Sequence, residues 1–126
     1  MKRLFAFAVL SATVGWAHAQ AGFTIRRPLD GSVVRETFEV RIPRSSVPPS
    51  GFVGILINDK FTEAVAPIQG VNLDSRDLIY RLDTKGKKLK DGPLKIEAVL
   101  YATNSDNRQI SLARSSVNVT VDNYSS

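Results

Sequence analysis

Short segments in which apolar and polar residues alternate constrain the fold of this chain more than any other feature. In the clearest, every second residue from Leu94 to Leu100 is apolar, and Lys95 and Glu97 fall between them. Successive side chains of a strand point to opposite faces, so this spacing predicts a β-strand with one face in a hydrophobic core. On the same grounds we expect strands at 23–27, 34–42, 52–57, 60–65, 78–83, 94–101 and 110–121.

Turn-forming residues separate these segments, as in an antiparallel sheet. Three such signals are Pro28 to Gly31, Asn58-Asp59 and Asn104 to Asn107. The stretch 66–77 shows little alternation and predicts a crossing between two sheets. About seven strands in roughly 100 residues predict an all-β, immunoglobulin-like antiparallel β-sandwich, with a small closed barrel as the alternative.

In the last expected strand, the apolar residues that should face the core change from even-numbered to odd-numbered positions. Ile110 and Leu112 share one parity, whereas the three valines between 117 and 121 share the other. A strand cannot turn both sets inward without an additional residue. We therefore predict a β-bulge between Ala113 and Ser116.

The first 19 residues have the three parts of an export signal in order. Lys2 and Arg3 form a basic head, an apolar run covers residues 4–15, and Ala17-His18-Ala19 is a pattern that a signal peptidase accepts. The run is shorter than the roughly 20 residues that cross a bilayer, so no membrane span is expected. We predict a signal peptide at 1–19 and one domain at 20–126, exported to the periplasm or outside the cell and, without a cysteine after the run, not a lipoprotein. Ala21 is a second possible cleavage site. The alternative to export is a cytoplasmic protein whose N-terminal residues form a buried helix.

Removal of residues 1–19 would also remove every Met, His and Trp of the chain. The 107 residues that remain contain no Cys, His, Met or Trp, and the formal net charge falls from +5 to +3. Such a domain has no disulfide, no zinc site built on Cys or His, no thiolate nucleophile and no triad with an imidazole. Its 12 acidic residues are scattered rather than paired as in a glycosidase. We therefore expect no enzyme, no catalytic residue, no metal and no cofactor.

Three motifs between Phe23 and Val121 together carry a resemblance to a known family. Residues 25–34 read IRRPLDGSVV, residues 89–98 read LKDGPLKIEA, and residues 113–121 read ARSSVNVTV. In this order they resemble the opening, the entry to the penultimate strand and the closing strand of bacterial immunoglobulin-like or fibronectin type III-like β-sandwich domains. The resemblance implies adhesion, matrix attachment or modular spacing, and it assigns no catalytic residue.

Four lysines gather in one predicted loop: Lys85, Lys87, Lys88 and Lys90. Positive charge concentrated in this way marks a candidate anion-binding loop for an acidic glycan, a lipid headgroup or an acidic partner. The alternative is a solvated loop without a ligand, which the absence of aromatic residues among the lysines favours. Nucleic acid is not expected as a partner, because the domain is exported and its net charge is only +3.

A second candidate lies on the predicted outer face of the middle strands. If alternate residues of 52–57 and 94–101 face the core, four apolar side chains face outward: Phe52, Leu56, Val99 and Tyr101. Together they predict an exposed apolar surface that binds a protein partner or a second copy of the chain. A different strand register, or cover by the loop at 66–77, is the alternative.

Two turns carry side-chain oxygens of the kind that calcium prefers: Asp74 with Asp77, and Asn104 with Asp106 and Asn107. Neither has the spacing of a defined calcium loop, and such residues favour turns for local reasons, so no metal site is expected. The sequence therefore predicts a small exported binding module that contacts a protein or another cell-envelope component. A carbohydrate-binding or matrix-attachment module, recognising an acidic glycan, and a structural subunit of a surface assembly are the alternatives. The oligomeric state is left open.

Overall fold

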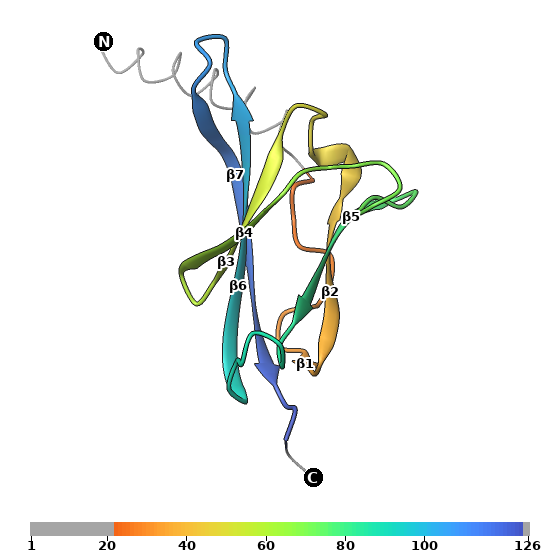
Figure 1. The fold of residues 1–126 in the computed structure, drawn as a ribbon, viewed down its shortest axis with the longest axis vertical. Coiled ribbons are helices and arrows are strands. Elements are labelled where there is room, and N and C mark those ends of the chain that lie inside the picture. The colour runs from red at the N-terminus through yellow and green to blue at the C-terminus, as the bar shows by residue number, and fades with distance from the viewer. Residues whose placement is uncertain (1–21, 125–126) are drawn as a thin grey trace, which may run out of the picture.

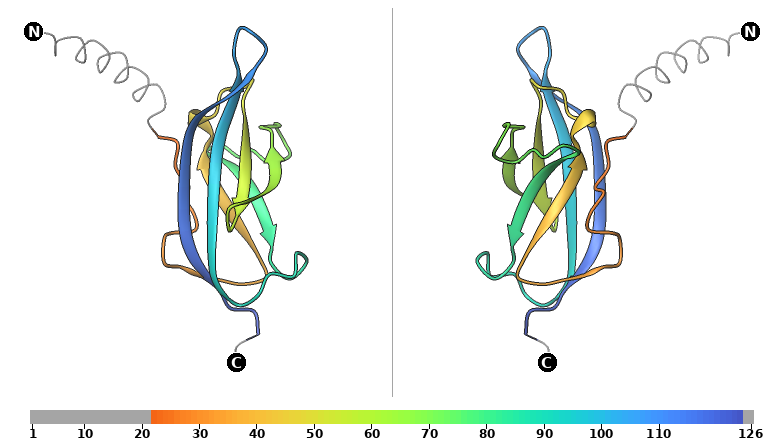
Figure 2. Two further views of the ribbon diagram at one scale, coloured as in Figure 1. Left: turned by 90° about the vertical axis from the view of Figure 1, so that its left-hand side faces the viewer. Right: turned by 90° about the vertical axis from the view of Figure 1, so that its right-hand side faces the viewer.

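Seven strands in two facing sheets make up the described part of the chain (Figure 1, Figure 2). The computed structural model describes residues 22–124, so the predicted signal peptide lies outside the described residues. The larger sheet has the order β1-β7-β6-β3-β4, and the smaller sheet pairs β2 with β5. The strands are β1 (Val33–Val34), β2 (Thr37–Pro43), β3 (Phe52–Ile57), β4 (Lys60–Val65), β5 (Asp77–Asp83), β6 (Gly92–Thr103) and β7 (Gln109–Val121), with one 3-10 turn, η1 (Arg44–Ser46), after β2. The predicted all-β, immunoglobulin-like sandwich is confirmed.

The predicted alternation places the hydrophobic core between the two sheets. The inward residues of β6 are each at most 3% exposed: Leu94, Ile96, Ala98 and Leu100. The smaller sheet contributes Val40, Ile42, Leu78, Tyr80 and Leu82. A fully buried aliphatic side chain contributes about 2 kcal/mol, so packing of this kind can hold the domain together without a disulfide.

The β3–β4 hairpin has the predicted bounds at both strands, 52–57 and 60–65. Asn58 and Asp59 form its two-residue turn with φ angles of 51° and 70°. A two-residue turn with positive φ at both positions matches the twist of the strands and fixes their register. Leu56 is therefore placed opposite Phe61 on the outer face of the larger sheet.

The strand predicted at 34–42 is divided between the two sheets. β1 pairs in parallel with β7 in the larger sheet, and β2 pairs with β5 in the smaller one. The chain passes between the sheets at Arg35 and Glu36, where Glu36 has a φ of 52°. Because the backbone changes direction at this residue, the predicted strand is interrupted between Val34 and Thr37.

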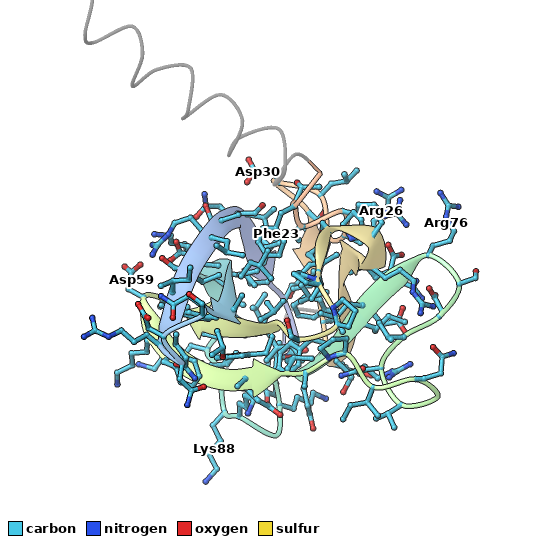
Figure 3. The ribbon with its side chains drawn as sticks, turned by 90° about the horizontal axis from the view of Figure 1, so that it is seen from above. Phe23, Arg26, Asp30, Asp59, Arg76 and Lys88 are labelled. Atoms are coloured by element: carbon cyan, nitrogen blue, oxygen red, sulfur yellow. The ribbon has the colours of Figure 1, made fainter. Side chains whose placement is uncertain are left out.

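The segment at 23–27 does not form the regular strand that its alternation predicts. Arg26 donates its N–H to the carbonyl of Arg41 in β2 (2.7 Å), whereas Ile25 donates its N–H to the Ser115 hydroxyl in β7 (3.0 Å). The segment thus divides its hydrogen bonds between the two sheets, which prevents a continuous ladder. Figure 3 shows Phe23, at its start, directed toward the interior.

The β-bulge of β7 lies nearer the hairpin than predicted. The β6–β7 register shifts between Leu100 and Tyr101, which leaves Leu112 as the additional residue. The predicted position between Ala113 and Ser116 is therefore wrong. The shift lets Leu112 pack against the core while the valines farther along β7 stay inward. Between Leu112 and the first of these valines, Ala113 and Ser115 are small enough to lie on either face of the strand. The apolar pattern alone therefore does not locate the bulge.

The connection at residues 66–76 crosses from the larger to the smaller sheet, as predicted, and covers part of β5. The carbonyl of Asn72 accepts the N–H of Ile79 (2.7 Å). The Asn72 side chain in turn accepts the N–H of Ile68 (2.9 Å) and donates to the carbonyl of Ala66 (2.7 Å). Ile79, on the outer face of the smaller sheet, is consequently only 6% exposed.

Candidate binding surfaces

The loop between β5 and β6 exposes all four of its lysines: Lys85, Lys87, Lys88 and Lys90. Backbone hydrogen bonds close the loop, from Leu89 N–H to Thr84 (2.9 Å) and from Lys87 N–H to Asp83 (3.0 Å). Lys88 has a φ of 56°, and its side chain projects away from the ribbon (Figure 3). The positive charges are therefore carried by a loop of defined backbone geometry.

Tyr124 lies beside this lysine loop although it follows β7, at the end of the described chain. The Nζ atom of Lys85 is 5.6 Å from the centroid of the Tyr124 ring, within the range of a cation–π contact. Figures 1 and 2 both place the loop and the end of β7 at the same end of the sandwich (Figure 1, Figure 2). No local spacing in the sequence signals this contact, because it arises from the long-range pairing of β6 with β7.

Of the four residues predicted on the outer face of the larger sheet, three are accessible. Phe52, Leu56 and Tyr101 are half-buried. The rings of Phe52 and Tyr101 stack, with centroids 5.1 Å apart and planes 20° apart, because the two residues are paired across β3 and β6. Val99 faces the same side but is only 1% exposed, so the expectation that it adds to the exposed surface is wrong.

Phe61 of β4 joins this face and was not among the predicted residues. It is 60% exposed. A Cβ added to Gly54 would lie 2.9 Å from Cε2 of Tyr101 and 3.1 Å from Cε1 of Phe61, so both rings lean over this glycine. Phe52, Phe61 and Tyr101 therefore form one aromatic cluster around Gly54, on three neighbouring strands. The register set by the Asn58-Asp59 turn was the sequence signal that could have included Phe61.

The acidic pair Asp74 and Asp77 is engaged by arginines. Arg26 donates Nε and Nη2 to the two carboxylate oxygens of Asp77 (2.9 and 2.8 Å), and Arg41 donates Nη1 to Asp77 (3.0 Å) and to Asp74 (2.7 Å). The bond from Arg26 above all lowers the pKa of the buried Asp77, and the bond from Arg41 lowers the pKa of Asp74. These carboxylates join the segment 23–27 to the smaller sheet, and their oxygens already accept protein hydrogen bonds.

The second oxygen-rich turn closes the β6–β7 hairpin. The Asn104 side chain accepts the N–H groups of Asp106 (2.9 Å) and Arg108 (3.0 Å). Among residues 22–124, no group of three or more His, Asp or Glu side chains is arranged to hold a metal ion. Within the same residues, no helix has the length and apolar character needed to span a bilayer.

A groove of about 450 Å³ is lined by β4 of the larger sheet, by β5 of the smaller sheet and by the connection at residues 66–76. Tyr80 lines it and is 8% exposed, and its hydroxyl forms no hydrogen bond of ordinary geometry in the described part of the chain, although the carboxylate of Glu63 lies nearby. Burial, followed by the negative charge of Glu63, raises the pKa of Tyr80 to about 12. A buried hydroxyl without a partner weakens a core, because its desolvation is not offset.

Comparison with known proteins identifies the fold of this chain. No protein-family model matches it, and no curated protein matches it. Among solved structures, it is similar to the fibronectin(III)-like modules of CbhA from Clostridium thermocellum, with 15% sequence identity and a TM-score of 0.52. The match covers 79% of this chain and 95% of that one. At this identity the likeness concerns the fold alone: the chain has a fibronectin type III-like β-sandwich fold.

Proposed function

We propose that this chain is an exported binding module without catalytic activity, which contacts a protein partner through the outer face of its larger sheet. Export rests on the predicted signal peptide at 1–19. The fold supports a binding or attachment role, since a rigid sandwich presents strand faces and loops for contact, but a fold alone does not assign one. The observation that carries the proposal is the aromatic cluster of Phe52, Phe61 and Tyr101.

The chemistry of this face resembles that of a protein interface. Aromatic residues are enriched at the centres of such interfaces, where they contribute much of the binding energy. Phe61 is 60% exposed, and Leu56 extends the apolar surface toward the hairpin turn. The ion pair between Arg114 and Glu97 (3.0 Å) borders it and supplies a polar rim.

The orientation of the rings favours a protein over a sugar at this face. Phe52 and Tyr101 stack on each other, so each ring covers one face of the other. The Cε2 atom of Tyr101 also lies over Gly54, so this ring packs against the backbone of β3 as well. A pyranose packs on an open aromatic face, whereas protein side chains pack equally well against ring edges.

In the test, the wild-type chain and two variants are immobilised, and the amounts of cell-envelope protein that each retains are compared. Phe61→Ser with Leu56→Ser alters the proposed surface, and Val33→Ser is the matched control. Val33 is an apolar residue of similar exposure, 66%, at the opposite edge of the same sheet. We expect the double variant to retain the partner at least about tenfold less, and the control to retain it as the wild type does.

High salt and sedimentation separate the alternatives. Apolar contacts are not screened by ions, so retention at this face should persist at high salt. If the partner is a second copy of the chain, sedimentation equilibrium should show self-association that the double variant loses. Equal retention by the double variant and the wild type, with unchanged sedimentation, would contradict the proposal.

A further inference from the structure

Three hydrogen bonds fix the end of the described chain against the lysine loop. The carboxylate of Asp91 accepts the N–H of Asn123 (2.8 Å) and the N–H of Tyr124 (3.0 Å). The Asn123 side chain donates to the hydroxyl of Thr84 (2.9 Å), which is itself fully buried. The backbone of Tyr124 is therefore held in place, while the residue as a whole remains 72% exposed.

The ring and the lysines share one open pocket of about 490 Å³. Its lining consists of Lys85, Lys88, Leu89, Lys90, Asp91 and Tyr124. Leu89 packs against the core on one side and supplies apolar surface to the pocket on the other. The pocket thus combines an aromatic ring, an aliphatic wall and three ammonium groups.

Positive charge in this pocket is not neutralised by its surroundings. Lys88 and Lys90 form no ion pair with any acidic residue of the described chain, and Lys85 is 3.8 Å from Glu36, at the limit of such a contact. Asp91 is the one carboxylate of the lining, and both of its oxygens already accept backbone N–H groups. The ammonium groups of Lys88 and Lys90 therefore remain available to an anion.

We propose that this pocket binds the hexuronate units of an acidic polysaccharide. A hexuronate has a pyranose ring, whose C–H face packs on an aromatic or aliphatic surface, and a carboxylate, which pairs with ammonium groups. Leu89 and the face of Tyr124 opposite Lys85 supply the surface for the ring, and Lys88 and Lys90 supply the charge. This site is separate from the aromatic cluster, so its ligand and the protein partner of the larger sheet are independent.

The shape and chemistry of the pocket favour a sugar over a lipid surface. Membrane binding by a loop requires apolar side chains that insert among the acyl chains, in addition to basic residues. Here Leu89 is half-buried, so Tyr124 is the one exposed aromatic or aliphatic residue in the lining of the pocket, and a single such residue is a weak membrane anchor. An acidic peptide would satisfy the lysines but would not need the ring.

The experiment titrates the full chain with oligogalacturonate by calorimetry. We expect saturable binding that weakens with salt, because the charges are exposed, and no binding of a neutral oligosaccharide of equal length. Lys88→Gln and Lys90→Gln should each weaken binding about threefold. Tyr124→Ser should weaken it about tenfold, whereas Tyr124→Phe, which keeps the ring, should bind as the wild type does.

Lys60→Gln is the matched control, because it removes one exposed lysine of β4 that does not line the pocket. It should leave the affinity unchanged. Polyglutamate and vesicles containing phosphatidylglycerol test the other sources of negative charge. The proposal is overturned if either binds as tightly as oligogalacturonate, if Tyr124→Ser has no effect, or if Lys60→Gln weakens binding as much as Lys88→Gln.

Discussion

Replacing Asp77 with asparagine keeps the shape of a buried side chain but removes its charge. The carboxylate accepts three hydrogen bonds, two from Arg26 and one from Arg41. Asparagine offers one acceptor oxygen, so at least one of these bonds is lost and the amide nitrogen faces an arginine donor. The substitution therefore weakens the link between the segment 23–27 and β5.

The magnitude follows from the number of bonds and from their exposure to water. A hydrogen bond to a charged group contributes about 1.5–3 kcal/mol, and the bonds that survive lose their charge–charge attraction. The side chains of Arg26 and Arg41 are 32% and 26% exposed, so water partly solvates the guanidinium groups that are freed. We expect the free energy of unfolding to fall by about 3 kcal/mol, a large share of the stability of a small domain.

Acid should reveal the same interaction in the wild type. The pKa of Asp77 in the folded chain lies below its ordinary value of 3.8, so the unfolded chain binds the proton more tightly. The stabilisation is complete above that ordinary value and is lost as the pH falls through the folded value. Between neutral pH and about pH 3, Asp77→Asn should therefore lose less stability than the wild type. The loss that the variant still shows would come in part from Asp74, whose pKa is also lowered in the folded chain.

The assay is urea unfolding followed by circular dichroism at neutral and acidic pH. Asp106→Asn is the matched control, because Asp106 is exposed in the β6–β7 turn and its substitution should change stability by less than about 0.5 kcal/mol. The reasoning is refuted if Asp77→Asn costs less than about 1 kcal/mol at neutral pH, or if its acid dependence equals that of the wild type.

Three further predictions test other parts of the sandwich. Tyr80→Phe removes the unpartnered buried hydroxyl and should raise the free energy of unfolding by about 1 kcal/mol. Because the pKa of Tyr80 is raised from 10.0 to about 12, wild-type stability should fall as the pH rises through this range in urea unfolding, and the variant should lose less. Gly51→Ala should lower the melting temperature more than Gly54→Ala, since the added Cβ would lie 2.9 Å from the backbone oxygen of Tyr101 at the first site and against movable rings at the second. Asp59→Gly should raise the free energy of unfolding slightly in urea, because relief of its positive φ of 70° outweighs the loss of its exposed ion pair with Lys95 (2.9 Å).

Local pattern predicts those parts of the fold that a short turn or the parity of one strand determines. The bounds of β3 and β4 follow from a two-residue turn between alternating segments, and the inward face of β6 follows from parity alone. Each depends on residues close in sequence. The segment 23–27 depends instead on contacts with strands far from it in sequence. The bulge at Leu112 is misplaced because the small residues that follow it fit on either face of the strand.

The candidate surfaces divide in the same way. The lysine loop is visible in the sequence because its residues are contiguous. Tyr124 reaches the loop only through the pairing of β6 with β7, which no local pattern indicates. Val99 lies on the outer face of β6, as its parity predicts, but parity does not show that neighbouring residues bury it. Phe61 lay within reach of prediction, because the turn at Asn58-Asp59 sets it opposite Leu56.

Hydrogen exchange of the chain with and without its retained envelope partner tests the central claim most directly. β4 is an edge strand of the larger sheet and carries the exposed Phe61, so its amides should exchange quickly in the free chain. We predict that the partner slows exchange in β4 and in the neighbouring turn at Asn58-Asp59, and leaves the loop between β5 and β6 unchanged. Protection confined to that loop or to β1, with β4 exchanging as in the free chain, would contradict binding through the aromatic cluster.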